Sequence, residues 1–156
     1  MLQPPATAEA VTDLILDVFR ANGAFLAAGD RLVSDLGLTS ARWQVLGAVA
    51  MAGTPLPVAG IARTMGLTRQ AVQRVVDDLA EAGYLRFAPN PHHRRAKLVL
   101  PTPEGAAAYR AAAERQRPWA AALADGLDPA ALRAAAALLR QLAQRLTGPD
   151  DQETGS

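Results

Sequence analysis

The sequence predicts a mainly α-helical fold with a small β-hairpin wing, that is, a winged helix–turn–helix flanked by N- and C-terminal helices. Three observations predict it. Hydrophobic residues recur at steps of three and four through most of the 156-residue chain. Two short helical stretches meet at a tight Gly66-Leu67 turn. Two strand-like segments then enclose a turn rich in Pro, His and Arg. A helix–turn–helix followed by a β-hairpin is the composition of a winged helix.

The first long helix is expected from about Ala8 to Leu36, because one apolar stripe runs through this segment. Thr7 is the expected N-cap, and Gly37 is expected to close the helix. Cap residues set the next boundaries: a second helix over about 40–51 after Thr39, a third from Pro57 to Gly66, and a fourth from Thr68 to about Ala82, closed by Gly83.

The remaining elements follow from strand and helix signals in the second half of the chain. Tyr84–Ala88 and Ala96–Leu100 are expected as strands, and a helix follows from Thr102 to about Ala124, kinked near Pro118. A last helix from Asp128 to about Leu146 is expected before a disordered tail. The domain organisation expected is an N-terminal dimerisation helix at 1–37, a DNA-binding winged helix–turn–helix lobe at 38–102, C-terminal dimerisation helices at 103–147 and the tail at 148–156.

Composition excludes several classes of protein. The chain has no cysteine, which excludes disulfide scaffolds, thiol catalysis and cysteine-ligated zinc. No apolar run is long enough to span a membrane, and the N-terminal segment lacks the pattern of a secretory signal, so we expect a cytoplasmic protein without a membrane partner. Residues 57–102 carry seven basic and three acidic residues, whereas the rest carries nine and twelve. This basic middle indicates a segment that faces a polyanion, although chance could produce so small a surplus.

The fourth helix carries the side chains best suited to DNA. At about 100° per residue, valines and Leu79 form one face, while arginine and glutamine side chains form the opposite one. Arg can bond guanine bidentately and Gln can bond adenine in the same way, and the helix N-terminus beside the Thr68 hydroxyl can bind a phosphate. An ordinary amphipathic surface helix would show the same periodicity. Asp77 and Asp78 are expected to hold the Arg74 side chain. The DNA-facing residues expected on this helix are Thr68, Arg69, Gln70, Gln73 and Arg74.

The hairpin tip, from Asn90 to Arg95, presents Arg94 and Arg95, which we expect to enter a minor groove. A solvated charged turn is the alternative. His92 and His93 are adjacent and have no third ligand nearby, so we expect no metal site. No catalytic arrangement or phosphate-binding loop is visible, so we expect neither an enzyme nor a cofactor. A small helical enzyme would need a convergent acid–base pair that the sequence does not show.

Dimerisation is expected because one recognition helix covers too few base pairs, so two half-sites about 34 Å apart are needed. The last helix offers an apolar stripe that includes Leu132, Leu139 and Leu146, and the first helix offers Ile15 and Phe25. In a monomer, these helices could instead pack on each other.

Residues 67–85, LTRQAVQRVVDDLAEAGYL, and 88–105, APNPHHRRAKLVLPTPEG, resemble the winged helix of MarR-family regulators. The segment Arg42–Leu46 resembles the second helix of that family. The resemblance implies a homodimer on double-stranded DNA, with one recognition helix in each major groove and a wing arginine in each minor groove. It also adds Ser40 to the expected DNA contacts. His93 stands where the family usually has an Asp, so the wing lacks an anion that could orient its arginines.

The resemblance further implies a small aromatic or phenolic effector, bound where the dimerisation helices meet the winged helix. The residues that would form this pocket are Asn22, Phe25, Arg42, Trp43 and Tyr109. Taken singly, Trp43 and Phe25 also fit the core, and Arg42 also fits an ion pair. The function expected is therefore a sequence-specific regulator, a repressor of a pseudopalindromic operator that the effector releases. The alternative is a winged helix that docks protein without binding DNA.

Overall fold

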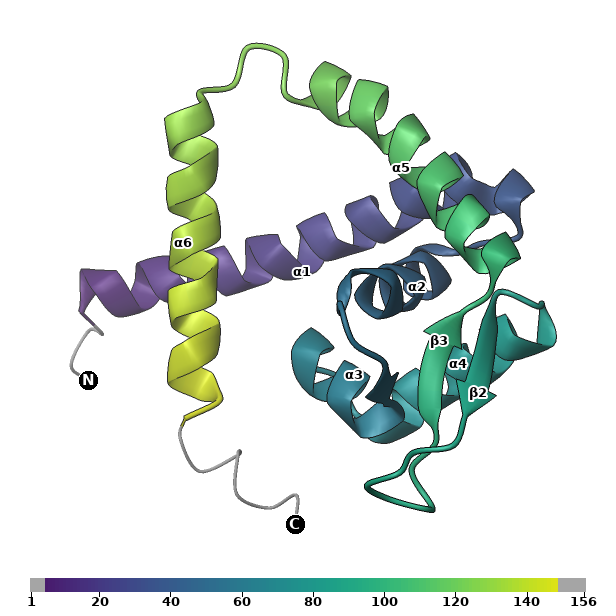
Figure 1. Cartoon of the computed structure of the whole chain (residues 1–156). Helices are drawn as coiled ribbons and strands as arrows, with labels where there is room; N and C mark the ends of the chain where they lie inside the picture. The colour runs from purple at the N-terminus through teal and green to yellow at the C-terminus, as the bar shows by residue number, and fades with distance from the viewer. Residues whose placement is uncertain (1–4, 149–156) are drawn as a thin grey trace. The chain divides into compact units, whose positions relative to one another are not determined.

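A computed structural model describes residues 5–148 of the chain (Figure 1). The expected disordered tail at 148–156 lies outside these residues, apart from Gly148. The described chain divides after Arg117 into two units. The first unit contains the winged helix, and the second contains the end of one long helix and the whole of the last helix.

The observed elements confirm the predicted mainly α fold with a small sheet. They run in the order α1 (Ala6–Val33), the 3-10 turn η1 (Ser34–Leu36), α2 (Ser40–Met51), β1 (Leu56–Pro57), α3 (Val58–Met65), α4 (Arg69–Glu81), β2 (Leu85–Ala88), β3 (Leu98–Pro101), α5 (Pro103–Leu123) and α6 (Pro129–Leu146).

Most predicted caps are confirmed. The Thr39 hydroxyl accepts from the Arg42 amide at the start of α2, and Asp128 accepts from the Ala130 amide at the start of α6. Thr7 as the cap of α1 is wrong: the helix begins at Ala6, and the carbonyl of Pro5 accepts from the Ala8 amide. With Pro5 as its N-cap, the helix begins two residues earlier than it would with a hydroxyl cap at Thr7.

The strand β1 is missing from the sequence prediction, which placed Pro57 inside a helix. Leu56 and Pro57 pair antiparallel with Leu98 and Val99, so the sheet has the order β1-β3-β2. A two-residue strand has no periodicity of its own. It forms because the outer edge of β3 has backbone groups free to pair. A proline is tolerated at position 57 because an edge strand does not need an amide donor on its solvent-facing side.

A single core fixes the winged helix around α4. Val72, Val76 and Leu79 on α4 are fully buried and belong to the same cluster as buried side chains from α2, α3 and the sheet. The α5 backbone approaches the start of the hairpin closely at Gly105, where a Cβ atom would lie 2.8 Å from the Tyr84 carbonyl carbon. Glycine is therefore required where α5 leaves the sheet.

Across residues 5–148, no helix combines the length and the apolar character needed to cross a membrane.

Candidate nucleic-acid interface

The helix α4 exposes one polar face. Arg69, Gln70, Gln73 and Arg74 are all exposed, whereas Val72 and Val76 on the opposite side have no exposed surface. The Thr68 hydroxyl accepts a hydrogen bond of 3.2 Å from the Ala71 amide and so caps the helix. The sharp turn before it is closed by Gly66, whose φ of +66° is a conformation that glycine adopts without strain.

The wing is the hairpin formed by β2 and β3 (Figure 1). Its tip is shaped by Asn90: the side-chain oxygen accepts from the His92 amide at 3.0 Å, and the side-chain nitrogen donates to the Ala96 carbonyl at 2.9 Å. These two bonds close the turn. Arg94 and Arg95 both extend from it and are exposed to solvent. The turn therefore has its own internal brace at Asn90, although His93 replaces the usual acid.

A concavity with a volume of about 930 Å³ lies between α4 and the wing. Cationic side chains reach it from both sides, since Arg69 and Arg74 come from α4 while Arg95 and Lys97 come from the wing. The other lining residues are Pro57, Val58, Ala59, Gln70, Gln73, Asp77, Phe87 and Ala96. This arrangement presents hydrogen-bond donors and positive charge to one ligand surface, which suits a phosphate backbone and base edges.

The two wing arginines face different hollows. Arg95 lines the large concavity beside α4, whereas Arg94 lines a smaller hollow of about 320 Å³ together with Phe87 and Asn90. Lys97 borders both. The structure thus brings Arg95 together with the α4 residues and sets Arg94 apart from them.

Ser40 does not belong to this surface, contrary to the prediction. Its side chain is 5% exposed, and its hydroxyl donates to the Leu26 carbonyl at 2.7 Å. Its amide donates to the Asp30 carboxylate at 2.7 Å. Both bonds attach the start of α2 to α1, so Ser40 is a structural contact between two helices and is not available to DNA.

The expected link from Arg74 to the neighbouring acids is also wrong. Asp77 accepts a 2.9 Å hydrogen bond from the Gln73 side chain, and Asp78 lies 3.6 Å from the Arg42 guanidinium. Helical periodicity alone leaves several partners possible for each acid. For Asp78, the packing of α2 beside α4 makes Arg42 the partner.

The residues expected at an effector pocket lie on three helices. Asn22 and Phe25 are exposed on α1, and Phe25 keeps 58% of its surface exposed. Trp43 on α2 packs against the core, and Arg42 pairs with Asp78. The Tyr109 hydroxyl on α5 contacts the Met51 sulfur at 3.1 Å. Tyr109 thus packs beside α2, while Arg42 is paired with α4 through Asp78.

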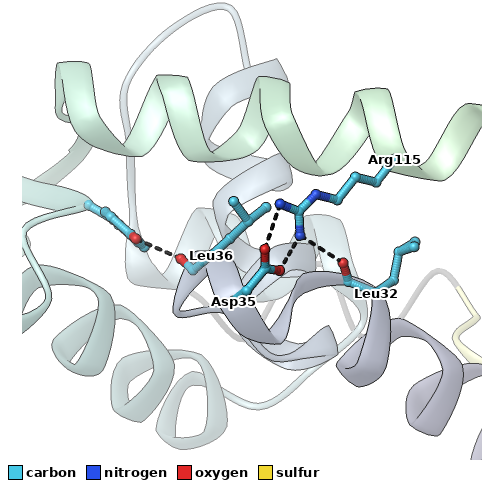
Figure 2. A network of polar contacts seen from close by, with 5 residues as sticks. Leu32, Asp35, Leu36 and Arg115 are labelled. Carbon is cyan, nitrogen blue, oxygen red and sulfur yellow. Dashed lines mark hydrogen bonds and ion pairs between the residues drawn. The ribbon is translucent and has the colours of Figure 1, made fainter.

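A polar network supports the base of the wing at the turn η1 (Figure 2). The Arg115 guanidinium on α5 bonds both oxygens of Asp35, one of them at 2.7 Å, and donates to the Leu32 carbonyl at 3.2 Å. The Tyr84 hydroxyl, from the residue just before β2, donates to the Leu36 carbonyl at 2.6 Å. Sequence reasoning missed this network, because its partners are 48 to 83 residues apart.

Comparisons with known proteins agree with this geometry. A family model described as the MarR family matches residues 36–96. An uncharacterized protein of Mycobacterium tuberculosis is 38% identical over 132 residues, which cover 85% of this chain and 91% of that protein. The multiple antibiotic resistance protein MarR of Salmonella typhimurium is 34% identical over 82 residues, which cover 50% of this chain and 56% of the relative.

Three solved structures are similar to this fold. A MarR-family transcriptional regulator from Rhodococcus sp. RHA1 aligns with a TM-score of 0.75 at 25% identity, over 85% of this chain and 94% of that one. CouR from Rhodococcus jostii RHA1, bound to p-coumaroyl-CoA, aligns at 0.71 and 25% identity, over 88% and 93%. The M. tuberculosis regulator MOSR, in complex with DNA, aligns at 0.71 and 23% identity, over 83% and 94%.

The fold and the basic concavity define a winged helix–turn–helix protein of the transcription-regulator class. The chain belongs to the MarR family, as the family model and the similar structures show. It is therefore a DNA-binding transcription regulator.

The η1 network predicts a pH dependence of stability. The hydrogen bonds from Arg115 hold the pKa of the Asp35 carboxyl below its ordinary value of 3.8, against a smaller opposing effect of desolvation. The bond to Asp35 likewise raises the pKa of Arg115. Because the folded state favours ionised Asp35, the stabilisation is present above pH 3.8 and is lost as the pH falls through the lower folded value.

Asp35→Asn should therefore lower the melting temperature at neutral pH, and the difference from wild type should shrink below pH 3.8. Thermal denaturation of both proteins between pH 2.5 and 7 measures this. Added salt should also reduce the difference, since the Asp35 side chain is 67% exposed. A difference that stays constant from neutral to acid pH would contradict an ionic role for Asp35.

Proposed function

We propose that the protein is a repressor that binds a pseudopalindromic operator as a homodimer and is released by a small aromatic effector. In this proposal α4 reads bases in the major groove through Arg69, Gln70, Gln73 and Arg74. The concavity shared by α4 and the wing is the observation that carries the proposal. It combines bidentate base-reading groups with cations that suit the phosphates on either side.

The wing contributes in two ways in this proposal. Arg95 faces the same concavity as the reading helix and so binds phosphates along the edge of the major groove. Arg94 faces away from it, beside Asn90, and is the residue placed to enter the minor groove. Thr68 and the N-terminus of α4 bind a further backbone phosphate.

A second copy of the chain is the partner that we propose for the apolar side chains of α1. Phe19 is 69% exposed and Phe25 is 58% exposed, and Ile15, Leu16 and Leu26 are exposed beside them. On α6, Leu132, Leu138, Leu139 and Leu146 are also exposed. Contiguous exposed apolar surface marks an interface, and two-fold DNA sites require a two-fold protein.

The effector is proposed from chemistry and from similarity. CouR, a structure at 25% identity, is bound to p-coumaroyl-CoA. Here Arg42 offers a cation, and Trp43 and Tyr109 offer aromatic rings. Arg42 pairs with Asp78 of α4. An acidic effector that forms an ion pair with Arg42 would therefore break the ion pair between Arg42 and the recognition helix. Release then requires that the effector bind the DNA-free form more tightly than the DNA-bound form.

Arg74→Ala tests the base-reading role of α4. If Arg74 bonds a base, the operator affinity should fall by about 1–3 kcal/mol and the preference at one base pair should disappear. Fluorescence anisotropy on operator and random duplexes at fixed salt measures both effects. Arg63→Ala is the matched control, because Arg63 is an exposed arginine of α3 outside the concavity. An equal loss on both duplexes would assign Arg74 to a phosphate instead.

Arg94→Ala combined with Arg95→Ala tests the wing. Each lost phosphate contact should reduce the slope of log K against log salt concentration by roughly 0.9. Binding titrations at four salt concentrations give the slope. An unchanged slope would place the wing outside the interface.

Phe19→Asp tests the dimer. A buried carboxylate at the subunit interface should separate the protomers, halving the mass by light scattering and weakening operator binding. Met51→Asp is the control, since Met51 is 77% exposed on α2. A Phe19→Asp protein that keeps the dimer mass would exclude the exposed face of α1 from the interface.

A panel of aromatic acids tests the effector. At saturation, an effector should raise the apparent Kd for the operator at least about tenfold, which is a coupling of ~1.4 kcal/mol. Tyr109→Phe keeps the ring and removes the hydroxyl, so it should weaken the response of a phenol-binding pocket. If no aromatic acid changes operator binding, the effector part of the proposal is wrong while DNA binding stands.

A further inference from the structure

The basic concavity contains an acid whose presence requires an explanation. Among the described residues that line it, four are cationic and Asp77 alone is acidic. Asp77 is exposed, so its carboxylate faces the same ligand as Arg69 and Arg74. A carboxylate beside a phosphate backbone weakens binding by repulsion. Its place on the reading face therefore points to a role other than affinity.

The partner of Asp77 is an amide and not a cation. The Gln73 Nε2 atom donates to the Asp77 Oδ1 atom at 2.9 Å, one helical turn away. The ion pairs formed within residues 5–148 join Arg20 to Asp17, Arg42 to Asp78 and Arg115 to Asp35, and none includes Asp77. Asp78 thus holds α4 against α2, while its neighbour Asp77 holds a side chain of the reading face itself.

This hydrogen bond fixes which way the Gln73 carboxamide points. An ionised carboxylate only accepts hydrogen bonds, so the amide must turn its nitrogen, and not its oxygen, toward Asp77. The Gln73 oxygen and the second N–H of the amide then remain for another partner. Without Asp77, rotation about the last side-chain bond would exchange the positions of oxygen and nitrogen at little cost.

A carboxamide held in this way distinguishes the two purines. Adenine offers a donor at N6 and an acceptor at N7, which match the free oxygen and the free N–H of Gln73. Guanine offers two acceptors, O6 and N7, so its O6 atom would oppose the Gln73 oxygen. A freely rotating amide could turn its nitrogen to guanine and so would discriminate less.

We propose that Asp77 is a positioning residue that orients the Gln73 carboxamide and thereby selects adenine over guanine at one operator base pair. The proposal rests on the proposed function, because it requires α4 in the major groove. Asp77 also repels phosphates. It therefore lowers the affinity for every duplex while it increases the discrimination between sequences.

The experiment begins by selecting preferred duplexes from a random pool with the full-length wild-type protein. The base pair whose identity becomes indifferent in Gln73→Ala is the Gln73 position. Anisotropy titrations then compare adenine and guanine at that position, and also a random duplex, for wild type and for Asp77→Ala, Asp77→Asn and Glu81→Ala. Glu81→Ala removes the same charge from α4, at a residue that does not line the concavity.

Wild type should favour adenine by roughly tenfold or more, and Asp77→Ala should reduce this to about threefold or less. The same variant should bind random duplex as tightly as wild type or more tightly. Asp77→Asn should show a preference between those of wild type and Asp77→Ala, because its amide oxygen can still accept from Gln73 but its amide nitrogen can also donate to the Gln73 oxygen in the reversed orientation. The double variant Gln73→Ala with Asp77→Ala should behave at this position like Gln73→Ala alone, because Asp77 acts only through Gln73.

The inference is overturned if Asp77→Ala keeps the full preference for adenine, if Asp77→Asn discriminates less than Asp77→Ala, or if Glu81→Ala reduces the preference as much as Asp77→Ala does. It is also overturned if Gln73→Ala changes the preference at no position. In each case, sequence selection by the wild-type protein would leave the proposed operator binding intact, although the last outcome would remove Gln73 from the base-reading residues. Absence of any selection by wild type would instead refute the proposed function.

Discussion

The burial of one face of α4 is the constraint on which the whole interface depends. Val72, Val76 and Leu79 have no exposed surface, and burying each contributes about 1.5–3 kcal/mol. These contacts do more than attach the helix. Because they fix its rotation about its own axis, they also determine that Arg69, Gln73 and Arg74 lie on the opposite, exposed side. A rotation of one residue would bury a guanidinium and expose a valine, and both changes are unfavourable.

The hairpin and the helix act as one surface because their junction is held from two directions. Tyr84, between α4 and β2, bonds the backbone of η1 through its hydroxyl, and Arg115 of α5 bonds Asp35 in the same turn (Figure 2). Thr102, where β3 passes into α5, donates through its hydroxyl to the Gly83 carbonyl at 2.6 Å. These long-range bonds fix where the wing begins relative to α4, and the Asn90 brace fixes how it ends.

The positive charge that matters for DNA is concentrated on one part of the protein surface. The net formal charge of the chain is +1, which is too small to attract DNA by itself. The concavity nevertheless brings together four cations from α4 and the wing. It also contains Asp77, so attraction to phosphate is not maximised. A regulator must prefer its operator to the many competing sites of a genome, and this preference depends on differences between sequences more than on total attraction.

The sequence by itself determined the helices, most of their caps and the polar face of α4, because these depend on periodicity and on neighbours within one or two turns. Thr39, Thr68 and Gly66 act where local chemistry places them. Only the tertiary structure decided the two-residue strand β1, the burial of Ser40 against Leu26, the pairing of Asp78 with Arg42, and the network at η1. Each of these joins segments at least ten residues apart. The local sequence pattern is compatible with several partners for each such residue, and tertiary packing determines which partner is used.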